Sequence, residues 1–161
     1  MSLKIIDNFL PIENFKEIQK ILLSEDVNWH FRPQINHKTD KNLFQFDHCF
    51  FENMMVYSNF FPLLQPIFKK LNCKSLVRAK MNLTTQTTES IFHGYHIDFK
   101  NNKTAIMYFN TTDGKTYFEN YDPVDCIENR LVSFDSDIKH SSSSCTDNLR
   151  RVVLNINYYE Y

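Results

Sequence analysis

The chain has 161 residues, of which 42% are hydrophobic and 15% aromatic, and this composition excludes a disordered chain and suits one folded domain. Its 18 basic and 19 acidic residues give a formal net charge of -1, so the composition offers no general attraction for nucleic acid. Gly94 and Gly114 are its only two glycines, which argues against a glycine-rich phosphate-binding loop.

Targeting signals are not evident in the sequence. The first ten residues contain no apolar run of the length of a signal peptide, and no segment has the roughly 20 apolar residues of a membrane-spanning helix. The four cysteines are scattered without a CxxC pair, which argues against a zinc knuckle. We expect a single domain over residues 1–161, located in the cytoplasm.

The first 75 residues are expected to form mainly helical support. Apolar side chains recur at helical spacing near 12–24 and again near 54–71, which predicts two helices. Pro62 and Pro66 count against the second of these helices.

From about residue 76 the rhythm changes to that of β-strands. Apolar residues alternate with Arg78, Lys80 and Asn82 over 77–83, which is typical of a half-buried strand. Asp113-Gly114 predicts a hairpin turn. Many short strands joined by turns predict a mostly β fold, a double-stranded β-helix (jelly-roll) core over about 76–160, with the helices packed on one outer face. The further strands are expected at 104–110, 115–119, 124–127, 131–134 and 150–159.

His96 and Asp98 are the first candidate metal ligands. On an extended chain, residues at i and i+2 project from the same face, so these two side chains can reach one ion. In a rolled β-structure His140 can return to face them. Two imidazoles and one carboxylate on one face of an octahedron leave adjacent positions open, which suits catalytic iron(II).

The last predicted strand carries the candidate anion-binding residue. Alternation places Arg151 and Asn155 on the inner face, and a buried arginine is costly unless an anion meets it. Arg151 is therefore predicted to hold a carboxylate of a bound dicarboxylate through its planar fork, with Arg150 as the alternative. The predicted set of cofactor-binding residues is Arg151, Tyr108, Asn82 and Asn155.

The order of these motifs resembles that of the 2-oxoglutarate/iron(II)-dependent dioxygenase superfamily, and within it the prolyl-hydroxylase-like branch. The resemblance covers about residues 76–160 and rests on His96-Ile97-Asp98, the segment 104–110, the segment 129–134, His140 and 151–155. It implies iron(II), O2 and 2-oxoglutarate as co-substrate, with decarboxylation to succinate and CO2. It also implies hydroxylation of a peptidyl amino acid, such as a proline, or of a small molecule.

Two other functions remain open at this stage. One is a cupin-like metalloenzyme of another class, such as a zinc or manganese hydrolase or isomerase. The other is a non-catalytic jelly-roll binding module with incidental histidines. We also expect His93 to point away from the metal ligands, Ser141 to Ser144 to form a solvated loop, and the loops at 32–42 and 84–95 to determine selectivity.

Overall fold

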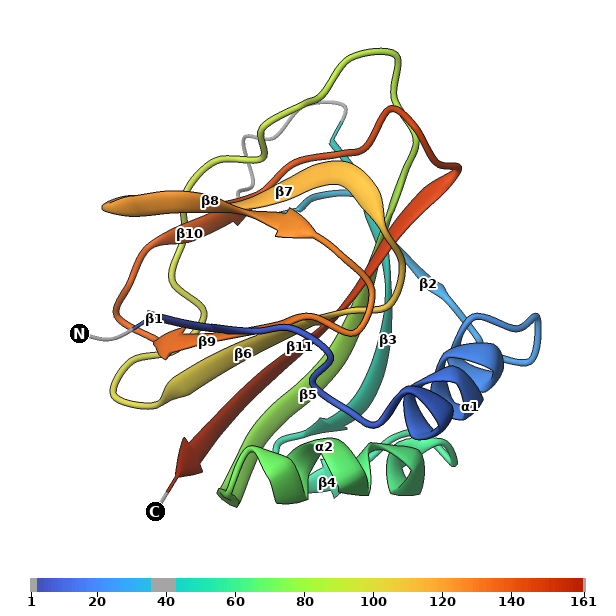
Figure 1. The fold of residues 1–161 in the computed structure, drawn as a ribbon, viewed down its shortest axis with the longest axis vertical. Helices are drawn as coiled ribbons and strands as arrows, with labels where there is room; N and C mark the ends of the chain where they lie inside the picture. Colours follow the sequence, from blue (N-terminus) through green and yellow to red (C-terminus); the bar gives the residue numbers. More distant parts are fainter. Residues whose placement is uncertain (1–2, 36–42, 161) are drawn as a thin grey trace.

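The computed structural model describes residues 3–35 and 43–160, which form two antiparallel sheets (Figure 1). Within these residues the large sheet has eight strands in the order β1-β9-β6-β11-β5-β3-β2, with β4 paired to β3, and the small sheet has the order β10-β7-β8. The strands of the large sheet are β1 (Leu3–Ile6), β2 (His30–Arg32), β3 (Gln45–Glu52), β4 (Met55–Val56), β5 (Cys73–Thr85), β6 (Lys103–Tyr108), β9 (Leu131–Asp135) and β11 (Arg150–Glu160). Those of the small sheet are β7 (Thr112–Phe118), β8 (Tyr121–Cys126) and β10 (His140–Ser142).

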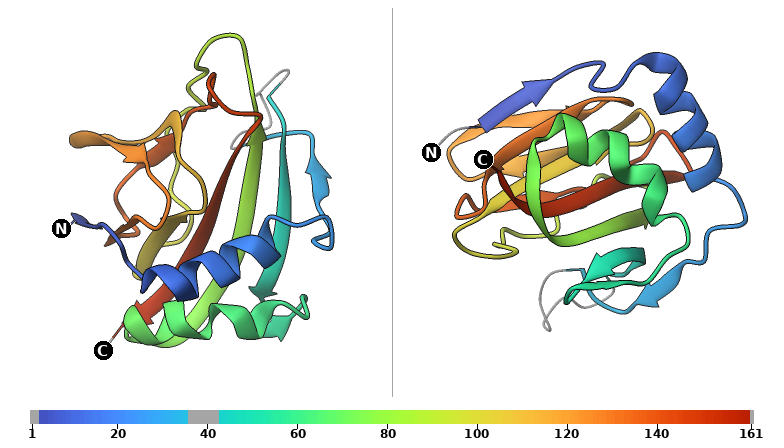
Figure 2. Two further views of the ribbon diagram at one scale, coloured as in Figure 1. Left: turned by 45° about the vertical axis from the view of Figure 1, so that its right-hand side comes forward. Right: turned by 90° about the horizontal axis from the view of Figure 1, so that it is seen from below.

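The helices cover the outer face of the large sheet (Figure 2). Helix α1 (Ile12–Leu22) and helix α2 (Gln65–Lys70), which follows a 3-10 turn over Phe61–Leu64, pack their apolar side chains on one core cluster. The same cluster contains Val152, Leu154 and Ile156 of β11. The predicted jelly roll with helices on one face is therefore confirmed. Among the described residues, no helix is both long and apolar enough to cross a membrane.

The opposite face of the large sheet looks toward the small sheet and carries polar side chains at its centre. Arg151 stands opposite Thr84 of β5, Asn155 stands opposite Lys80, and Asn157 stands opposite Arg78. Because residues two apart share a face, this register assembles a polar ladder across β11 and β5 between the two sheets. A smaller apolar cluster, which includes Val153 and Phe118, packs between the sheets beside this ladder.

Several local predictions were wrong. The first 75 residues contribute four strands in addition to helices, and β3 was not predicted as a strand. The second helix is shorter than 54–71, because Pro62 and Pro66 sit at the beginnings of two separate helical segments.

The predicted turn at Asp113-Gly114 was also wrong. Both residues lie inside β7, and the hairpin to β8 turns at Glu119 and Asn120 instead. A register irregularity between Thr112 and Lys115 passes through this position, so the backbone bends there without reversing.

Candidate functional site

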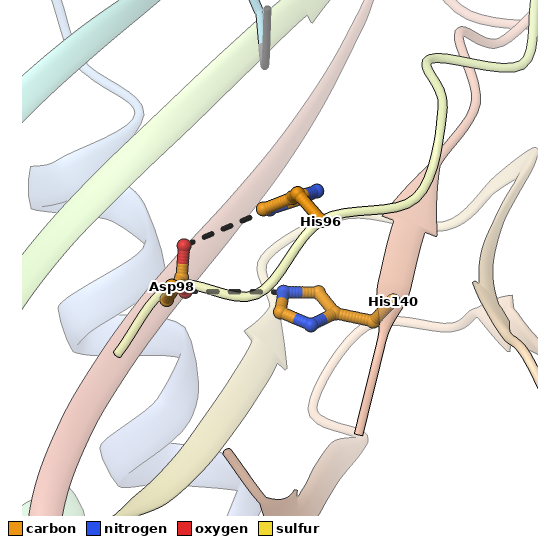
Figure 3. Close-up of side chains that lie close together, drawn as sticks. All are labelled: His96, Asp98 and His140. Atoms are coloured by element: carbon orange, nitrogen blue, oxygen red, sulfur yellow. Dashed lines mark ion pairs between the residues drawn. The ribbon is translucent and has the colours of Figure 1, made fainter. Parts of the chain in front are cut away.

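The backbone holds His96 and His140 side by side. His96 lies in the segment between β5 and β6, and His140 begins β10 (Figure 3). The His96 amide donates to the His140 carbonyl at 2.9 Å, and the His140 amide donates to the His96 carbonyl at 3.0 Å. This backbone pairing places the two imidazole rings next to each other, with their centroids 4.4 Å apart. Two residues that are remote in sequence are thus fixed as an antiparallel bridged pair.

Asp98 completes a group that could hold one metal ion. Its Oδ1 lies 3.6 Å from His96 Nε2 and its Oδ2 lies 3.8 Å from His140 Nε2 (Figure 3). One ligand atom from each of the three residues falls within 4.8 Å of the others. The buried His140 Nε2 has no hydrogen-bond partner in the described part of the chain. A buried polar atom without a partner is unusual, and here it leaves the nitrogen available to bind a metal ion. The donor set fits iron(II).

The electrostatics keep Asp98 and His140 in the protonation states that metal binding requires. Burial disfavours the Asp98 carboxylate, but the neighbouring His96 and the charge of Arg78 outweigh it and hold the pKa of Asp98 well below its usual range. Burial, together with the neighbouring His96, lowers the pKa of His140 to about 4. At neutral pH the site therefore offers an ionised carboxylate and a neutral imidazole.

Three further side chains orient the Asp98 carboxylate. Asn155 Nδ2 donates to Oδ2 at 2.8 Å, and Asn157 Nδ2 approaches the same oxygen at 3.4 Å. Arg78 Nη2 lies 3.1 Å from Oδ1. Asn155 was predicted to bind the cofactor; it lines the cavity, and its amide nitrogen contacts the candidate metal ligand. Such hydrogen bonds to a ligating carboxylate fix its orientation.

A cavity of about 270 Å³ extends from the candidate metal ligands to Arg151. The Arg151 side chain is buried, and its Nη2 donates to Thr116 Oγ1 at 3.0 Å. Its Nε is buried without a partner among the residues that the structure describes, and no ion pair of Arg151 is found there. Asn82, which was predicted to bind the cofactor, also lines the cavity. A buried guanidinium with unused donors is suited to an anion that enters the cavity.

Tyr108 lies behind this guanidinium and does not line the cavity. Its hydroxyl donates to Thr116 Oγ1 at 2.8 Å, and its ring centroid lies 5.7 Å from Arg151 Cζ. Burial raises the pKa of Tyr108 to about 12, so the phenol stays protonated. Thr116 Oγ1 then accepts two hydrogen bonds, from Tyr108 and from Arg151, and its own proton is left for a group in the cavity. Sequence reasoning missed Thr116, although strand alternation over 115–119 could have placed it on the inner face.

Gly114 allows Arg151 to take this position. A Cβ at Gly114 would lie 2.8 Å from Arg151 Cδ and 2.9 Å from the Ser144 carbonyl oxygen. The absence of a side chain at this point of β7 is therefore what makes room for the buried arginine. The alternative candidate, Arg150, points to the outer face, where its Nη2 donates to the Leu23 carbonyl at 2.9 Å.

The remaining predictions near the site had mixed outcomes. His93 is outside the metal-binding group, and its Nδ1 lies 2.9 Å from Ser142 Oγ. The expectation of a solvated loop at Ser141 to Ser144 was wrong, because Ser141 and Ser142 belong to β10 and Ser141, Ser143 and Ser144 are buried. Of the loop predicted at 32–42, Ile35 lines the cavity, whereas 36–42 lie outside the described residues.

No family model and no curated protein matches the sequence. Solved structures do match. A prolyl hydroxylase from Trichoplax adhaerens, in complex with a peptide fragment of the hypoxia inducible factor oxygen degradation domain, has a TM-score of 0.66 and 14% identity, over 98% of this chain and 83% of that chain. A prolyl-4-hydroxylase from Pseudomonas putida has a TM-score of 0.60 and 12% identity, over 99% of this chain and 92% of that chain. HygX from Streptomyces hygroscopicus, with nickel and 2-oxoglutarate bound, has a TM-score of 0.63 and 8% identity, over 98% of this chain and 82% of that chain.

At these identities the likeness concerns the fold. The chain has the jelly-roll fold of 2-oxoglutarate/iron(II) oxygenases, prolyl hydroxylases included, as the resemblance in its motifs predicted. The group of His96, Asp98 and His140, consistent with iron binding, lies inside this fold.

Proposed function

We propose that this chain is a single oxygenase domain that binds iron(II) through His96, Asp98 and His140 and uses 2-oxoglutarate as co-substrate. The observation that carries the proposal is the pairing of two features in one cavity. A two-histidine, one-carboxylate group lies at one place on its wall, and the buried Arg151 guanidinium lies at another. The metal group alone would suit several classes of metalloenzyme, whereas the arginine adds a specific place for a dicarboxylate.

In the proposed reaction the protein mainly binds and orients its reactants. Iron bound at the triad supplies the oxidising chemistry, in which O2 is consumed, 2-oxoglutarate loses CO2 to give succinate, and the substrate gains a hydroxyl group. Arg151 and Thr116 would hold the far carboxylate of 2-oxoglutarate, with the arginine supplying the charge and the threonine an O–H donor. Asn155 and Arg78 would hold the Asp98 carboxylate in a fixed orientation toward the metal.

The proposed substrate is a peptidyl amino acid or a small molecule. Two of the matching structures bear on this choice: the Trichoplax enzyme holds a peptide fragment, and another relative of the same fold is the epimerase SnoN from nogalamycin biosynthesis, with a TM-score of 0.64. Because one fold serves both kinds of substrate, the site itself has to discriminate between them.

The test is anaerobic addition of iron(II) and then 2-oxoglutarate, with measurement of the weak visible charge-transfer band of the chelate. We expect the band in the wild type and its loss in His96→Ala, because one of three protein ligands is removed. His30→Ala is the matched control, since His30 is exposed on β2 and lies outside the metal-binding group.

Two results would count against the proposal. Tight binding of zinc or manganese without any affinity for 2-oxoglutarate would indicate a cupin-like metalloenzyme of another class. Absence of tight metal binding by a folded wild-type protein would indicate a non-catalytic binding module.

A further inference from the structure

The cavity carries more positive charge than the proposed metal and co-substrate require. Its charged lining consists of the three cations Arg78, Lys80 and Arg151 and the single carboxylate Asp98, which leaves a net charge of +2. A divalent ion adds two positive charges and the 2-oxoglutarate dianion removes them. The loaded cavity would thus keep an excess of +2, in a setting where burial makes charge interactions strong.

Lys80 is the cation that the proposed function leaves without a role. It lies on β5, opposite Asn155 of β11 on one side and Cys49 of β3 on the other, so it projects from the middle of the sheet face that forms the cavity wall. Its side chain is 19% exposed. Burial, with the neighbouring charge of Arg78, lowers the pKa of this amine.

The acidic partner of Lys80 is already engaged. Lys80 Nζ lies 3.6 Å from Asp47 Oδ2, which is longer than a hydrogen bond, whereas Arg32 Nε donates to the same oxygen at 2.8 Å. Asp47 and Arg32 together form a neutral pair beside the cavity. Within the described residues Lys80 Nζ thus has this one long ion pair and no hydrogen bond, and its side chain lines the cavity.

Arg78 adds a second cationic group on the same strand and the same face. It pairs with Asp98 and its guanidinium carbon lies 4.9 Å from the centroid of the Phe99 ring, so its position is fixed from two sides. Its Nε is buried without a partner among the residues that the structure describes. Since Arg78 and Lys80 are i and i+2 on β5, their side chains stand next to each other along one wall.

We infer that the substrate oxidised at this site carries an anionic group, and that Lys80, assisted by Arg78, binds it. This inference rests on the proposed function, because the charge balance assumes a bound divalent ion and 2-oxoglutarate. It narrows the substrate class from any peptide side chain or small molecule to one that bears a carboxylate or a similar anion near the reacting carbon. Neutral proline in a neutral peptide does not meet this requirement.

The test measures binding of matched acidic and amide probes to the iron(II) protein under anaerobic conditions with saturating 2-oxoglutarate, so that Arg151 is occupied. The probes are free L-aspartate against L-asparagine, and N-acetyl-aspartate amide against N-acetyl-asparagine amide. We expect at least one acidic probe to bind about tenfold more tightly than its amide. The pair that shows the preference distinguishes a free acid from an acidic side chain in a peptide.

Lys80→Met removes the charge at nearly constant side-chain length, and Lys20→Met, on the exposed end of α1, is the control. We expect the acid–amide preference to fall to within twofold in Lys80→Met and to persist in Lys20→Met, while both variants keep wild-type affinity for iron and 2-oxoglutarate. Equal affinity of the wild type for both members of each pair overturns the inference, and so does a preference that survives in Lys80→Met.

The outcomes also separate the inference from the proposed function. A loss of 2-oxoglutarate affinity in Lys80→Met would show that this lysine holds the co-substrate, which overturns the inference and leaves the oxygenase proposal intact. Failure of the wild type to bind 2-oxoglutarate would instead overturn the proposed function itself.

Discussion

Arg151→Met separates co-substrate binding from metal binding and from folding. The guanidinium has one N–H engaged with Thr116 and a buried Nε without a partner, so a fork remains for a carboxylate. Net contributions of hydrogen bonds to charged groups are about 1.5–3 kcal/mol, and we take about 3 kcal/mol for a two-bond pair. Since about 1.4 kcal/mol is a factor of ten, the affinity for 2-oxoglutarate should fall roughly 100-fold.

The same substitution should leave the unliganded protein at least as stable as the wild type. Without an anion, the folded wild type buries a guanidinium that has only a neutral hydroxyl for a partner, and replacing buried charges by apolar groups is often neutral or stabilising. Loss of 2-oxoglutarate affinity with no loss of unfolding temperature would therefore point to a binding role.

Isothermal titration of the metal-loaded protein under anaerobic conditions measures the affinity directly, and thermal unfolding gives an independent reading. At a 2-oxoglutarate concentration of 100 times the wild-type Kd, the ligand should stabilise the wild type by about 2.7 kcal/mol and the variant by about 0.4 kcal/mol. Arg150→Met is the matched control, because its guanidinium faces the helices and donates to Leu23. An affinity of Arg151→Met within twofold of the wild type would refute the assignment.

Two further substitutions test the residues that position Arg151 and Asp98. Gly114→Ala places a methyl group 2.8 Å from Arg151 Cδ and should displace the arginine. We expect the affinity for 2-oxoglutarate to fall about tenfold in the same titrations, while the affinity for iron stays unchanged. An equal loss of both affinities would indicate a general disturbance of the fold. Asn155→Ala removes the 2.8 Å hydrogen bond to Asp98, and we expect iron affinity to fall about 10–100-fold in a competition assay with a chelator. Asn82→Ala, which lines the cavity and has no hydrogen bond to Asp98 among the described residues, should leave iron affinity unchanged, and a similar loss in both asparagine variants would contradict the role given to Asn155.

Strands with regular alternation were predictable from the sequence. The outer face of β11 and the polar side of β5 follow from period two alone, and both predictions agree with the register of these strands. β3 was missed because its pattern is irregular: Asp47 and His48 are consecutive buried polar residues, and a register shift between Cys49 and Phe51 breaks the period. Local pattern cannot reveal a strand whose polar residues are buried by the tertiary structure.

The candidate metal group was easier to predict from the sequence than the rest of the site. His96 and Asp98 are two residues apart, so their proximity needs little tertiary information, and the motif order supplied His140. Alternation could have placed Thr116 on the inner face, but its role depends on how β7 lies above β11, and this contact between two sheets cannot be read from the pattern of one strand. Gly114 was also misread, because the dipeptide Asp113-Gly114 is typical of a turn. In the structure Gly114 lies in β7, where the Arg151 side chain packs against it and leaves no room for a Cβ.

The reciprocal backbone bonds between His96 and His140 bear on how the metal site assembles. Fixing the backbone of one residue costs about 1–2 kcal/mol, and here that cost is met when the chain folds and not when an ion arrives. The ligand pair is thus preorganised, so metal uptake should need little rearrangement, and the affinity for the ion should persist until the segment around His96 separates from β10. Hydrogen exchange at these two amides would then report on separation of the His96 segment from β10, and a bound ion that joins the two side chains should slow this exchange.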